Sequence, residues 1–342
     1  MKPFFPERAY FEPMSLNYPL GQKLNKLFKD RGIETHVMIS SKIYNAIPAD
    51  NIREKYANAK RTLIVSVKKG NVLYKCKPSA DYEFSISSNC PANCEYCYLY
   101  TVKSRKPYIR VFVNLEDILA LVEDYIKKSE KKITTFEASS LSDPLSVEHL
   151  TGNLAKTISF FGKKENARLR VVSKYDNVDS LLNIEHNGHT KFRFSVNSRY
   201  VIKNFEHNSA SFDERITALS KIFDAGYPTG VIIAPIMIYG NWKEEYKELI
   251  ETLAKKIDSK KCLEPFSFEM IQHRFTKDAK STILERFPGT KLDMDEEKRI
   301  LKWGKFGRFK YVYPSEISNE MKEYISKLID ENFSNYVIEY FT

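Results

Sequence analysis

From Asp81 onward the sequence alternates between short apolar runs and amphipathic segments, and this alternation restricts the possible folds. Six runs have the length and residue content of strands: Tyr82–Ile86, Ile133–Glu137, Arg168–Val172, Phe192–Val196, Val231–Pro235 and Phe266–Met270. The segments with helical periodicity are Leu115–Lys128, Ser146–Phe161, Phe212–Ala225 and Trp242–Ile257. Strands that alternate with helices form parallel sheets, with functional groups at the carboxyl ends of the strands. The pattern predicts an α/β fold, a partial (β/α)6 barrel over residues 81–277.

Two flanking regions complete the predicted organisation of the 342 residues. Residues 1–80 are expected to form an N-terminal α/β extension, with a helix at Gly21–Arg31 and a strand at Arg61–Val67. Residues 278–342 are expected to form a C-terminal region, in which apolar residues recur at helical spacing over Glu316–Asn332.

Three of the five cysteines, Cys90, Cys94 and Cys97, follow the first predicted strand within eight residues. Three thiolates at this spacing can hold one soft metal centre. A structural zinc site and an ordinary iron–sulfur cluster each need four ligands. A three-cysteine set therefore leaves one iron of a four-iron cluster open to an external ligand. A zinc site completed by Cys76 or a histidine is the alternative.

Charge and composition indicate the partner and the compartment. Lys and Arg number 54 against 44 Asp and Glu, a net charge of +10. This excess favours a polyanionic partner, because neutralising phosphates drives nucleic-acid binding. The sequence has no apolar run of membrane-spanning length and no evident apolar leader, so we expect no membrane association. Cysteines spaced as metal ligands suit a reducing cytoplasm better than a disulfide framework.

The cysteine spacing CxxxCxxC, with the aromatic Tyr96 before the last cysteine, resembles the signature of radical S-adenosylmethionine (SAM) enzymes. In that superfamily SAM binds the open iron of a [4Fe–4S] cluster and is split into methionine and a 5′-deoxyadenosyl radical. Candidate SAM contacts follow the predicted strands. Lys174 suits the methionyl carboxylate, Ser195 and Asn197 suit the ribose hydroxyls, and the backbone at Ala234 could flank the adenine.

Longer stretches resemble the spore photoproduct lyase family over nearly the whole chain: KPSADYEFSISSNCPANCEYCYLYT, KPYIRVFVN, TTFEASSLSDP, KFRFSVNSRYVIKNFE, AGYPTGVIIAPI, FEMIQHRFTK and KWGKFGRFKYVY. The resemblance implies a DNA-repair enzyme that reverses, without light, the methylene-bridged thymine dimer that ultraviolet light makes in spore DNA. It implies a [4Fe–4S] cluster on the three cysteines, and SAM contacts from Tyr98 and Ser142. It also implies a flavodoxin- or ferredoxin-type electron donor, a monomer, and a place in the spore core.

The same resemblance makes position 140 important. In the family, breaking the bond between the thymines leaves a thymine methyl radical. A cysteine at the position of Ser140 gives it a hydrogen atom, and Tyr98 with Tyr96 relays the radical back towards SAM. Ser140 has a much stronger O–H bond and is a poor donor. We therefore predict that this chain begins the reaction but completes it poorly, and that Ser140→Cys restores clean repair.

A lesion inside a duplex must be flipped out to reach a radical centre. The segment Trp303–Tyr313 alternates aromatic and basic residues, which predicts a β-hairpin that inserts rings and contacts phosphates. The candidate DNA or lesion contacts are Trp303, Lys305, Phe306, Arg308, Lys310, Tyr311, His273 and Arg274. Alternatively the hairpin packs its rings on the barrel. Two other functions stay open: a radical SAM enzyme acting on RNA or a peptide, and a zinc-bearing nucleic-acid-binding module.

Overall fold

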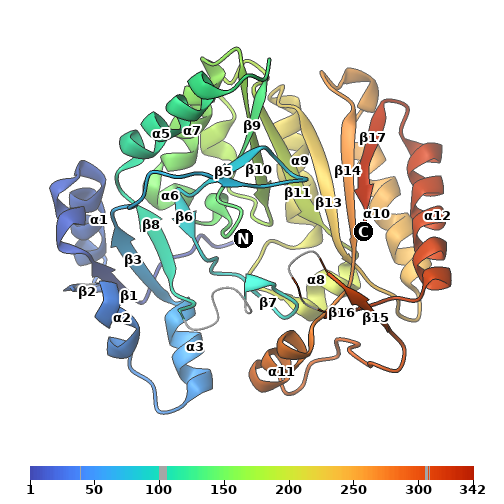
Figure 1. Ribbon diagram of the computed structural model, residues 1–342, viewed down its shortest axis with the longest axis horizontal. Coiled ribbons are helices and arrows are strands. Elements are labelled where there is room, and N and C mark those ends of the chain that lie inside the picture. Colours follow the sequence, from blue (N-terminus) through green and yellow to red (C-terminus); the bar gives the residue numbers. More distant parts are fainter. Residues whose placement is uncertain (39, 100–105, 305–306, 308) are drawn as a thin grey trace. The chain divides into compact units, whose positions relative to one another are not determined.

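The computed structural model describes the whole chain except residues 39, 100–105, 305–306 and 308 (Figure 1). The chain forms two compact units, which are described separately. The first comprises Met1–Pro91 and Lys103–Lys191, and the second Ala92–Val102 and Phe192–Thr342. The predicted divisions at residues 80 and 277 stay predictions. No helix in the described part of the chain is long and apolar enough to cross a membrane.

The first unit contains a five-stranded sheet with the order β2–β1–β3–β8–β6. Its strands are β1 (Arg8–Phe11), β2 (Glu34–Val37), β3 (Thr62–Ser66), β6 (Ser87–Ser88) and β8 (Ile109–Phe112). Neighbours are parallel except for the pair β6–β8. The helices of this region are α1 (Pro19–Asp30), α2 (Ser40–Ala46) and α3 (Ile52–Lys60), after a short 3-10 helix η1 (Pro13–Asn17).

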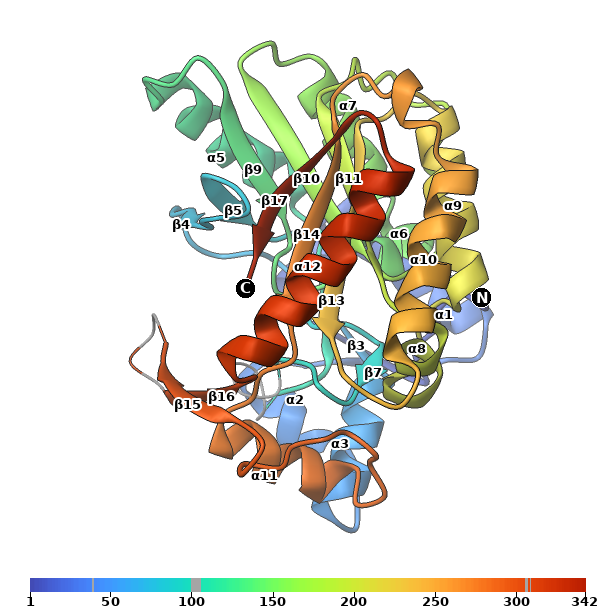
Figure 2. The same cartoon turned by 90° about the vertical axis from the view of Figure 1, so that its right-hand side faces the viewer.

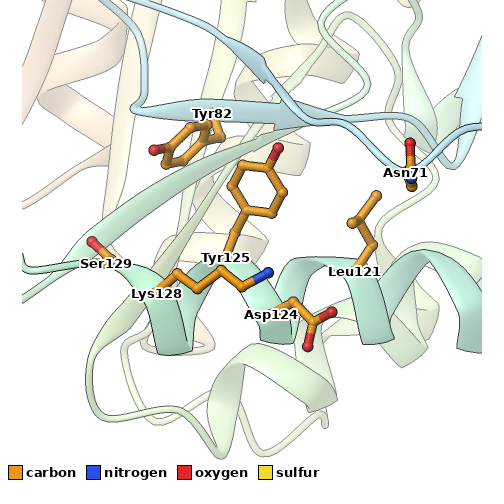
Figure 3. Close-up of a pocket in the computed structure, with 7 residues that line it drawn as sticks. All are labelled: Asn71, Tyr82, Leu121, Asp124, Tyr125, Lys128 and Ser129. Atoms are coloured by element: carbon orange, nitrogen blue, oxygen red, sulfur yellow. The ribbon is translucent and has the colours of Figure 1, made fainter.

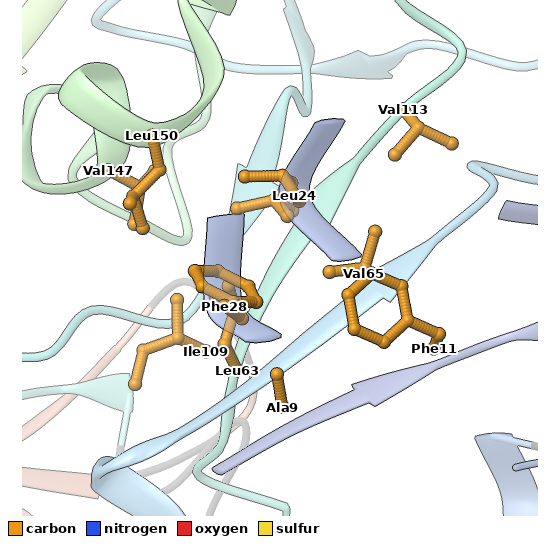
Figure 4. Close-up of a cluster of buried hydrophobic side chains, with 11 residues drawn as sticks. Ala9, Phe11, Leu24, Phe28, Leu63, Val65, Ile109, Val113, Val147 and Leu150 are labelled. Atoms are coloured by element: carbon orange, nitrogen blue, oxygen red, sulfur yellow. The ribbon is translucent and has the colours of Figure 1, made fainter. Parts of the chain in front are cut away.

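The two faces of this sheet bury different apolar clusters, because side chains alternate along β1 and β3. Phe11 and Val65 pack with Leu24 and Phe28 of α1 (Figure 4). On the other face, Ile64 lies in a second cluster with residues of α2 and α3. Helix α1 lies where apolar periodicity predicted a helix, and β3 lies where RTLIVSV predicted a strand.

A second group of strands in the first unit carries the predicted barrel pattern. The strands are β4 (Tyr74–Lys75), β5 (Tyr82–Phe84), β9 (Thr134–Ala138) and β10 (Ala167–Ser173). Strand β4 is antiparallel to β5, whereas β5, β9 and β10 are parallel. Helix α5 (Leu115–Lys128) has its predicted bounds, and a 3-10 helix η3 (Asp179–Leu181) follows β10.

The single helix predicted at Ser146–Phe161 is wrong. The observed elements are η2 (Pro144–Val147), α6 (Glu148–Thr151) and α7 (Asn153–Gly162). Gly152 separates the two α-helices with φ of +64°, a left-handed conformation that glycine adopts without steric cost. The Glu148 carboxylate accepts hydrogen bonds from the backbone N–H groups of Leu154 (2.8 Å) and Ala155 (3.0 Å) and so caps α7.

The second unit contains four parallel strands, of which the first three match the remaining predicted strands. They are β11 (Thr190–Val196), β13 (Thr229–Ile236), β14 (Phe266–Gln272) and β17 (Tyr336–Phe341), paired in that order. The helices are α8 (Arg199–Phe205), α9 (Phe212–Asp224), α10 (Trp242–Lys256), η4 (Ser259–Lys261), α11 (Lys277–Arg286) and α12 (Ser315–Asn332). Helices α9, α10 and α12 lie side by side along these strands (Figure 2). The predicted capping box between Ser211 and Glu214 is confirmed.

Two antiparallel strand pairs complete the second unit. Strand β7 (Asn93–Cys94) pairs with β12 (Glu206–His207), and β15 (Ile300–Trp303) pairs with β16 (Phe309–Val312). The β15–β16 pair is a hairpin and lies where the aromatic and basic alternation predicted one.

Candidate active site

The cysteine loop contains three thiols that form no disulfide. Cys94 is buried in β7, and Cys90 and Cys97 are half-buried. The Cys97 backbone N–H donates to the Cys94 carbonyl (3.2 Å), so a tight turn joins these two residues. The Cys90 carbonyl accepts a hydrogen bond from Lys60 Nζ (2.6 Å), and its Sγ lies 3.9 Å from the Tyr175 hydroxyl.

The donor chemistry of this loop fits an iron–sulfur cluster, because it offers three soft ligands outside any disulfide. Cys90 belongs to the first unit, whereas Cys94 and Cys97 belong to the second. The structure therefore describes the surroundings of each thiol and not a three-thiol geometry. Over the described residues, no three His, Cys, Asp or Glu side chains lie in a preformed metal-binding arrangement.

A buried charged network holds Tyr96 behind the cysteine loop. The Tyr96 hydroxyl donates to the Glu206 carboxylate, which also forms a 2.5 Å ion pair with Arg215. Both side chains of that ion pair are fully buried. Burial, followed by the negative charge of Glu206, raises the pKa of Tyr96 well above its usual value. The Tyr96 phenol therefore stays protonated. Tyr98, two residues later in the chain, is 57% exposed.

The turn after β9, Ser139–Asp143, is called the β9 turn below. Ser139 has φ of +58°, and its hydroxyl accepts hydrogen bonds from the backbone N–H groups of Ile86 (3.0 Å) and Ser87 (3.2 Å). The Ser142 hydroxyl donates to the Asn89 carbonyl (2.5 Å). These bonds fasten the β9 turn to the segment that leads from β5 into the cysteine loop.

The β9 turn also positions the other predicted site residues of the first unit. The Ser140 hydroxyl donates to the Glu83 carboxylate. The buried Asp143 carboxylate accepts hydrogen bonds from the Ser173 hydroxyl (2.8 Å) and the Lys174 backbone N–H (2.7 Å). The structure therefore brings Ser140, Ser142 and the backbone of Lys174 together at the carboxyl ends of β9 and β10, as the sequence pattern predicted.

The second unit places Ser195, Asn197 and Ala234 at the ends of β11 and β13. Asn197 is fully buried. Its Nδ2 donates to the Pro235 carbonyl (2.7 Å), and its Oδ1 accepts from the Tyr246 hydroxyl (2.9 Å). The amide thus ties the ends of two strands to α10. Ribose binding by Ser195 and Asn197, and adenine packing at Ala234, stay predictions.

The β15–β16 hairpin has an exposed aromatic pair. Trp303 is directly opposite Phe309, and their exposed fractions are 63% and 53%. Their rings meet edge to face, with centroids 4.7 Å apart. Tyr311 is buried, and its ring stacks on Phe275 at 5.2 Å. One set of rings is therefore packed, as the alternative interpretation predicted, and the other faces outward, while insertion of rings into DNA stays a prediction. The candidates Lys305, Phe306 and Arg308 lie outside the described residues.

The two candidates beside this hairpin differ from each other. Arg274 is exposed, and its charge adds to burial in lowering the pKa of Lys310. His273 is only 3% exposed and stacks on Phe275. Burial and then the nearby Arg299 guanidinium lower the pKa of His273 to about 3. The structure therefore makes His273 a neutral core residue, and its contact with DNA stays a prediction.

A cavity of about 470 Å³ lies elsewhere in the first unit, between β5 and α5 (Figure 3). Tyr82 and Tyr125 form its wall, with ring centroids 4.9 Å apart. Tyr82 precedes Glu83 in β5, so these neighbouring side chains face opposite sides of the strand. The cavity is thus on the other face from the Glu83–Ser140 contact.

Sequence reasoning missed the acidic and basic residues that hold the site. Glu83 contacts Ser140, Glu206 contacts Tyr96, and Arg215 donates to the backbone carbonyl of Ser195. The available signal was a charged residue close to the end of an apolar run, as at Glu83 in YEFSI. A buried charge needs a partner, so such positions indicate an internal network.

Parallel strands with polar carboxyl-terminal turns, together with a CxxxCxxC loop whose thiols form no disulfide, define an α/β protein of the radical SAM class. Comparisons with known proteins identify the family. A family model described as spore photoproduct lyase matches residues 4–342. The spore photoproduct lyase of Geobacillus sp. (strain Y412MC61) is 46% identical over 100% of both chains. That of Bacillus subtilis (strain 168) is 44% identical over 99% of both. The chain belongs to the spore photoproduct lyase family.

Solved structures of spore photoproduct lyase match the full length of this chain with a TM-score of 0.94 and 44% identity. One is complexed with dinucleoside spore photoproduct. Another is a double variant with bound AdoMet and dinucleoside spore photoproduct, in which alanine replaces cysteine at position 140 and cysteine replaces serine at position 76. These matches confirm the predicted radical SAM barrel fold. They do not favour a zinc-bearing module or a radical SAM enzyme for RNA or peptides.

Proposed function

We propose that this chain repairs the spore photoproduct in DNA as a radical SAM lyase, without light. The observation that carries the proposal is the end-to-end match with spore photoproduct lyases at 44–46% identity. Repair breaks the methylene bridge between two thymines and returns both bases. The β9 turn supports this function, because it holds polar groups at the strand ends where barrel enzymes carry their chemistry.

The cofactors implied are a [4Fe–4S] cluster on Cys90, Cys94 and Cys97 and a SAM molecule at the open iron. When bound, they supply a 5′-deoxyadenosyl radical that takes a hydrogen atom from the lesion. The residues of this chain orient the reactants. Asp143 fixes the backbone at Lys174, whose ammonium would meet the SAM carboxylate. The other proposed SAM contacts are Tyr98, Ser142, Ser195, Asn197 and Ala234.

The β15–β16 hairpin is the proposed DNA-binding element. Exposed Trp303 and Phe309 can insert into the gap left by a flipped lesion, while Lys302 and Lys310, which pair across the hairpin, can meet phosphates. A net charge of +10 supports a duplex DNA partner. We further propose a small electron-transfer protein as the reductant, action as a monomer, and a place in the cytoplasm of the spore.

Turnover of the reconstituted chain on a synthetic dinucleoside lesion tests this function. We expect anaerobic protein with SAM and a reductant to consume the lesion and leave undamaged thymine dinucleoside unchanged. The cluster should give an electron paramagnetic resonance signal that changes when SAM is added. Zinc without iron and sulfide, or a cluster indifferent to SAM, would contradict the proposal.

A further inference from the structure

The proposed reaction begins with one electron that comes from outside the chain. The reductant has to deliver this electron to the cysteine loop, where the cluster is proposed to bind. Electron transfer between two proteins becomes much slower as the distance between their redox centres grows. The reductant must therefore bind to a surface that lies beside one of the three cysteines.

We propose that the outer face of α3, together with Lys106, is the docking surface for an acidic electron-transfer protein of the flavodoxin or ferredoxin type. The inference rests on the proposed function and adds to it the place where the reductant binds. All the residues that carry the argument belong to the first unit. This surface is called the α3 surface below, and its residues are Ile52, Arg53, Ala57, Lys60 and Lys106.

Helix α3 has a packed face and an outer face. Its residue Ala59 is buried in an apolar cluster with Ile64 of β3, which fixes the helix against the five-stranded sheet. Arg53, Ala57 and Lys60 are spaced at i, i+4 and i+7, so they share another face of the helix. Arg53 and Ala57 are exposed and Lys60 is half-buried. The outer face is therefore accessible to a partner while the helix itself is held in place.

Lys60 connects the outer face to the cysteine loop. Its Nζ donates a hydrogen bond to the Cys90 carbonyl at 2.6 Å. This bond and the short covalent path from the carbonyl to Cys90 Sγ join the α3 surface to a proposed cluster ligand. The buried Asn89 side chain donates to the Lys106 carbonyl at 3.0 Å, which holds the exposed Lys106 beside the residue that precedes Cys90. A partner on the α3 surface would therefore lie next to Cys90.

The charge of the α3 surface fits an acidic partner. Its ionisable residues, Arg53, Lys60 and Lys106, are all basic. The acidic residue of α3, Glu54, is occupied at the start of the helix, where its carboxylate accepts the Asp50 backbone N–H at 2.7 Å. Opposite charges across an interface accelerate association and orient the two proteins. An electron-transfer protein with a negative surface is therefore attracted to the side of the cysteine loop.

The apolar residues of the α3 surface favour a protein over DNA as its partner. Ile52 begins α3 and is 67% exposed, and Ala57 is exposed between the two basic residues of the outer face. Protein interfaces combine an apolar centre with a charged rim, and electron-transfer complexes need only a small area. A phosphate backbone binds through charge and gains little from such apolar side chains. The β15–β16 hairpin remains the surface proposed for DNA.

The step at the α3 surface is the transfer of one electron. The partner is oxidised by one electron and the cluster is reduced by one. No bond forms or breaks at this surface, and no proton has to move there. The positive charge of Lys60 beside Cys90 stabilises the negative charge that arrives.

The test compares a protein reductant with a small uncharged one. Reduced flavodoxin or photoreduced 5-deazariboflavin is mixed with the reconstituted chain without oxygen, and cluster reduction is followed by absorbance. Arg53→Glu should slow reduction by flavodoxin about tenfold at low salt and less at high salt, because a rim charge acts on association. Ile52→Ala should slow it at every salt concentration. Both variants should be reduced by 5-deazariboflavin at the rate of the unchanged chain.

Binding gives a readout that needs no turnover. The dissociation constant of labelled flavodoxin, measured by fluorescence anisotropy, should rise about tenfold in Arg53→Glu at low salt. A carbodiimide should join a flavodoxin carboxylate to Lys106, and high salt should prevent this cross-link. Lys132→Glu is the matched control, because Lys132 is exposed and follows α5, which lies at the opposite end of the first unit from α3 (Figures 1 and 2). It should bind flavodoxin like the unchanged chain.

Three results would overturn the docking surface. The first is equal flavodoxin binding and reduction for Arg53→Glu and the unchanged chain. The second is a loss of duplex affinity in Arg53→Glu with flavodoxin binding unchanged, which would assign the surface to DNA. The third is an unchanged chain that 5-deazariboflavin reduces but neither flavodoxin nor ferredoxin does. Failure of the chain reduced by 5-deazariboflavin to cleave SAM would instead overturn the proposed function itself.

Discussion

The β9 turn and the β15–β16 hairpin use polar and aromatic residues in opposite ways. In the turn, Ser139, Ser140, Ser142 and Asp143 each make a side-chain hydrogen bond within the protein. In the hairpin, the rings of Trp303 and Phe309 contact each other and remain mostly exposed.

This difference indicates that the β9 turn is suited to chemistry and the β15–β16 hairpin to DNA recognition. A reacting centre needs groups that are already oriented, because reorganisation during the reaction costs rate. A DNA-binding surface needs side chains that gain contacts only when the partner arrives. Mutations in the turn should therefore affect stability and chemistry together, whereas mutations on the outer face of the hairpin should affect affinity alone.

The largest effect is expected for Asp143→Ala. It leaves the buried Ser173 hydroxyl and Lys174 N–H without their acceptor, which should cost about 3 kcal/mol of unfolding free energy. SAM cleavage should fall at least tenfold, because Lys174 loses its anchor. Denaturant unfolding and a SAM-cleavage assay measure the two quantities.

Asp143→Asn is the matched control, because it keeps one acceptor oxygen in the same volume. We expect it to retain part of both the stability and the activity. A stability loss below about 0.5 kcal/mol for Asp143→Ala, the level usual for surface changes, would contradict the view that the β9 turn is preorganised.

Sequence periodicity predicted most of the fold because the strands and helices bury one regular face. Helix α5 and the capping box of α9 were predicted residue by residue. The break at Gly152 was not, because a lone glycine within a helical pattern does not reveal its backbone angle. The short strand β8 was also missed, since YIRVF lies outside the repeating pattern.

The sequence predicted which positions form the candidate site, but it did not predict the contacts that their side chains make. Strand ends indicated Ser140, Ser142 and Lys174, which the structure does place together through the β9 turn. Nothing in the sequence distinguished His273, which is buried, from the exposed Arg274 beside it, because their burial depends on the later segment that contains Arg299.

An intermediate effect is expected for Trp303→Ala on the hairpin. Loss of one stacking ring costs about 2 kcal/mol, so the affinity for lesion-containing duplex should fall roughly 30-fold. Turnover of the dinucleoside lesion, which needs no base flipping, should be unchanged. Fluorescence anisotropy with labelled duplex and product assays on the dinucleoside separate the two effects.

Leu263→Ala is the control for Trp303→Ala, since Leu263 is 73% exposed and lies outside the hairpin. Its duplex affinity should match that of the unchanged chain. Equal losses on duplex and dinucleoside for Trp303→Ala would instead place the ring in the chemical step and break the contrast with the β9 turn.

The smallest effect concerns the inner face of the hairpin, where His273 stacks on Phe275 beneath Tyr311. The native pKa of His273 is about 3, whereas an unfolded histidine titrates near 6.5. Below about pH 6.5 the unfolded chain therefore binds a proton here that the native chain does not, so stability falls as pH falls. Between pH 7.5 and 5.5 this amounts to about 1.4 kcal/mol.

His273→Phe removes the titrating group and keeps a ring for stacking. The unchanged chain should therefore lose about 1.4 kcal/mol more unfolding free energy than His273→Phe between pH 7.5 and 5.5. Urea unfolding at both pH values measures the difference, in which the other ionisable groups cancel. Parallel losses in the two proteins would show that His273 takes up a proton in the native state. The inner face would then be open to solvent, like the outer face that carries Trp303.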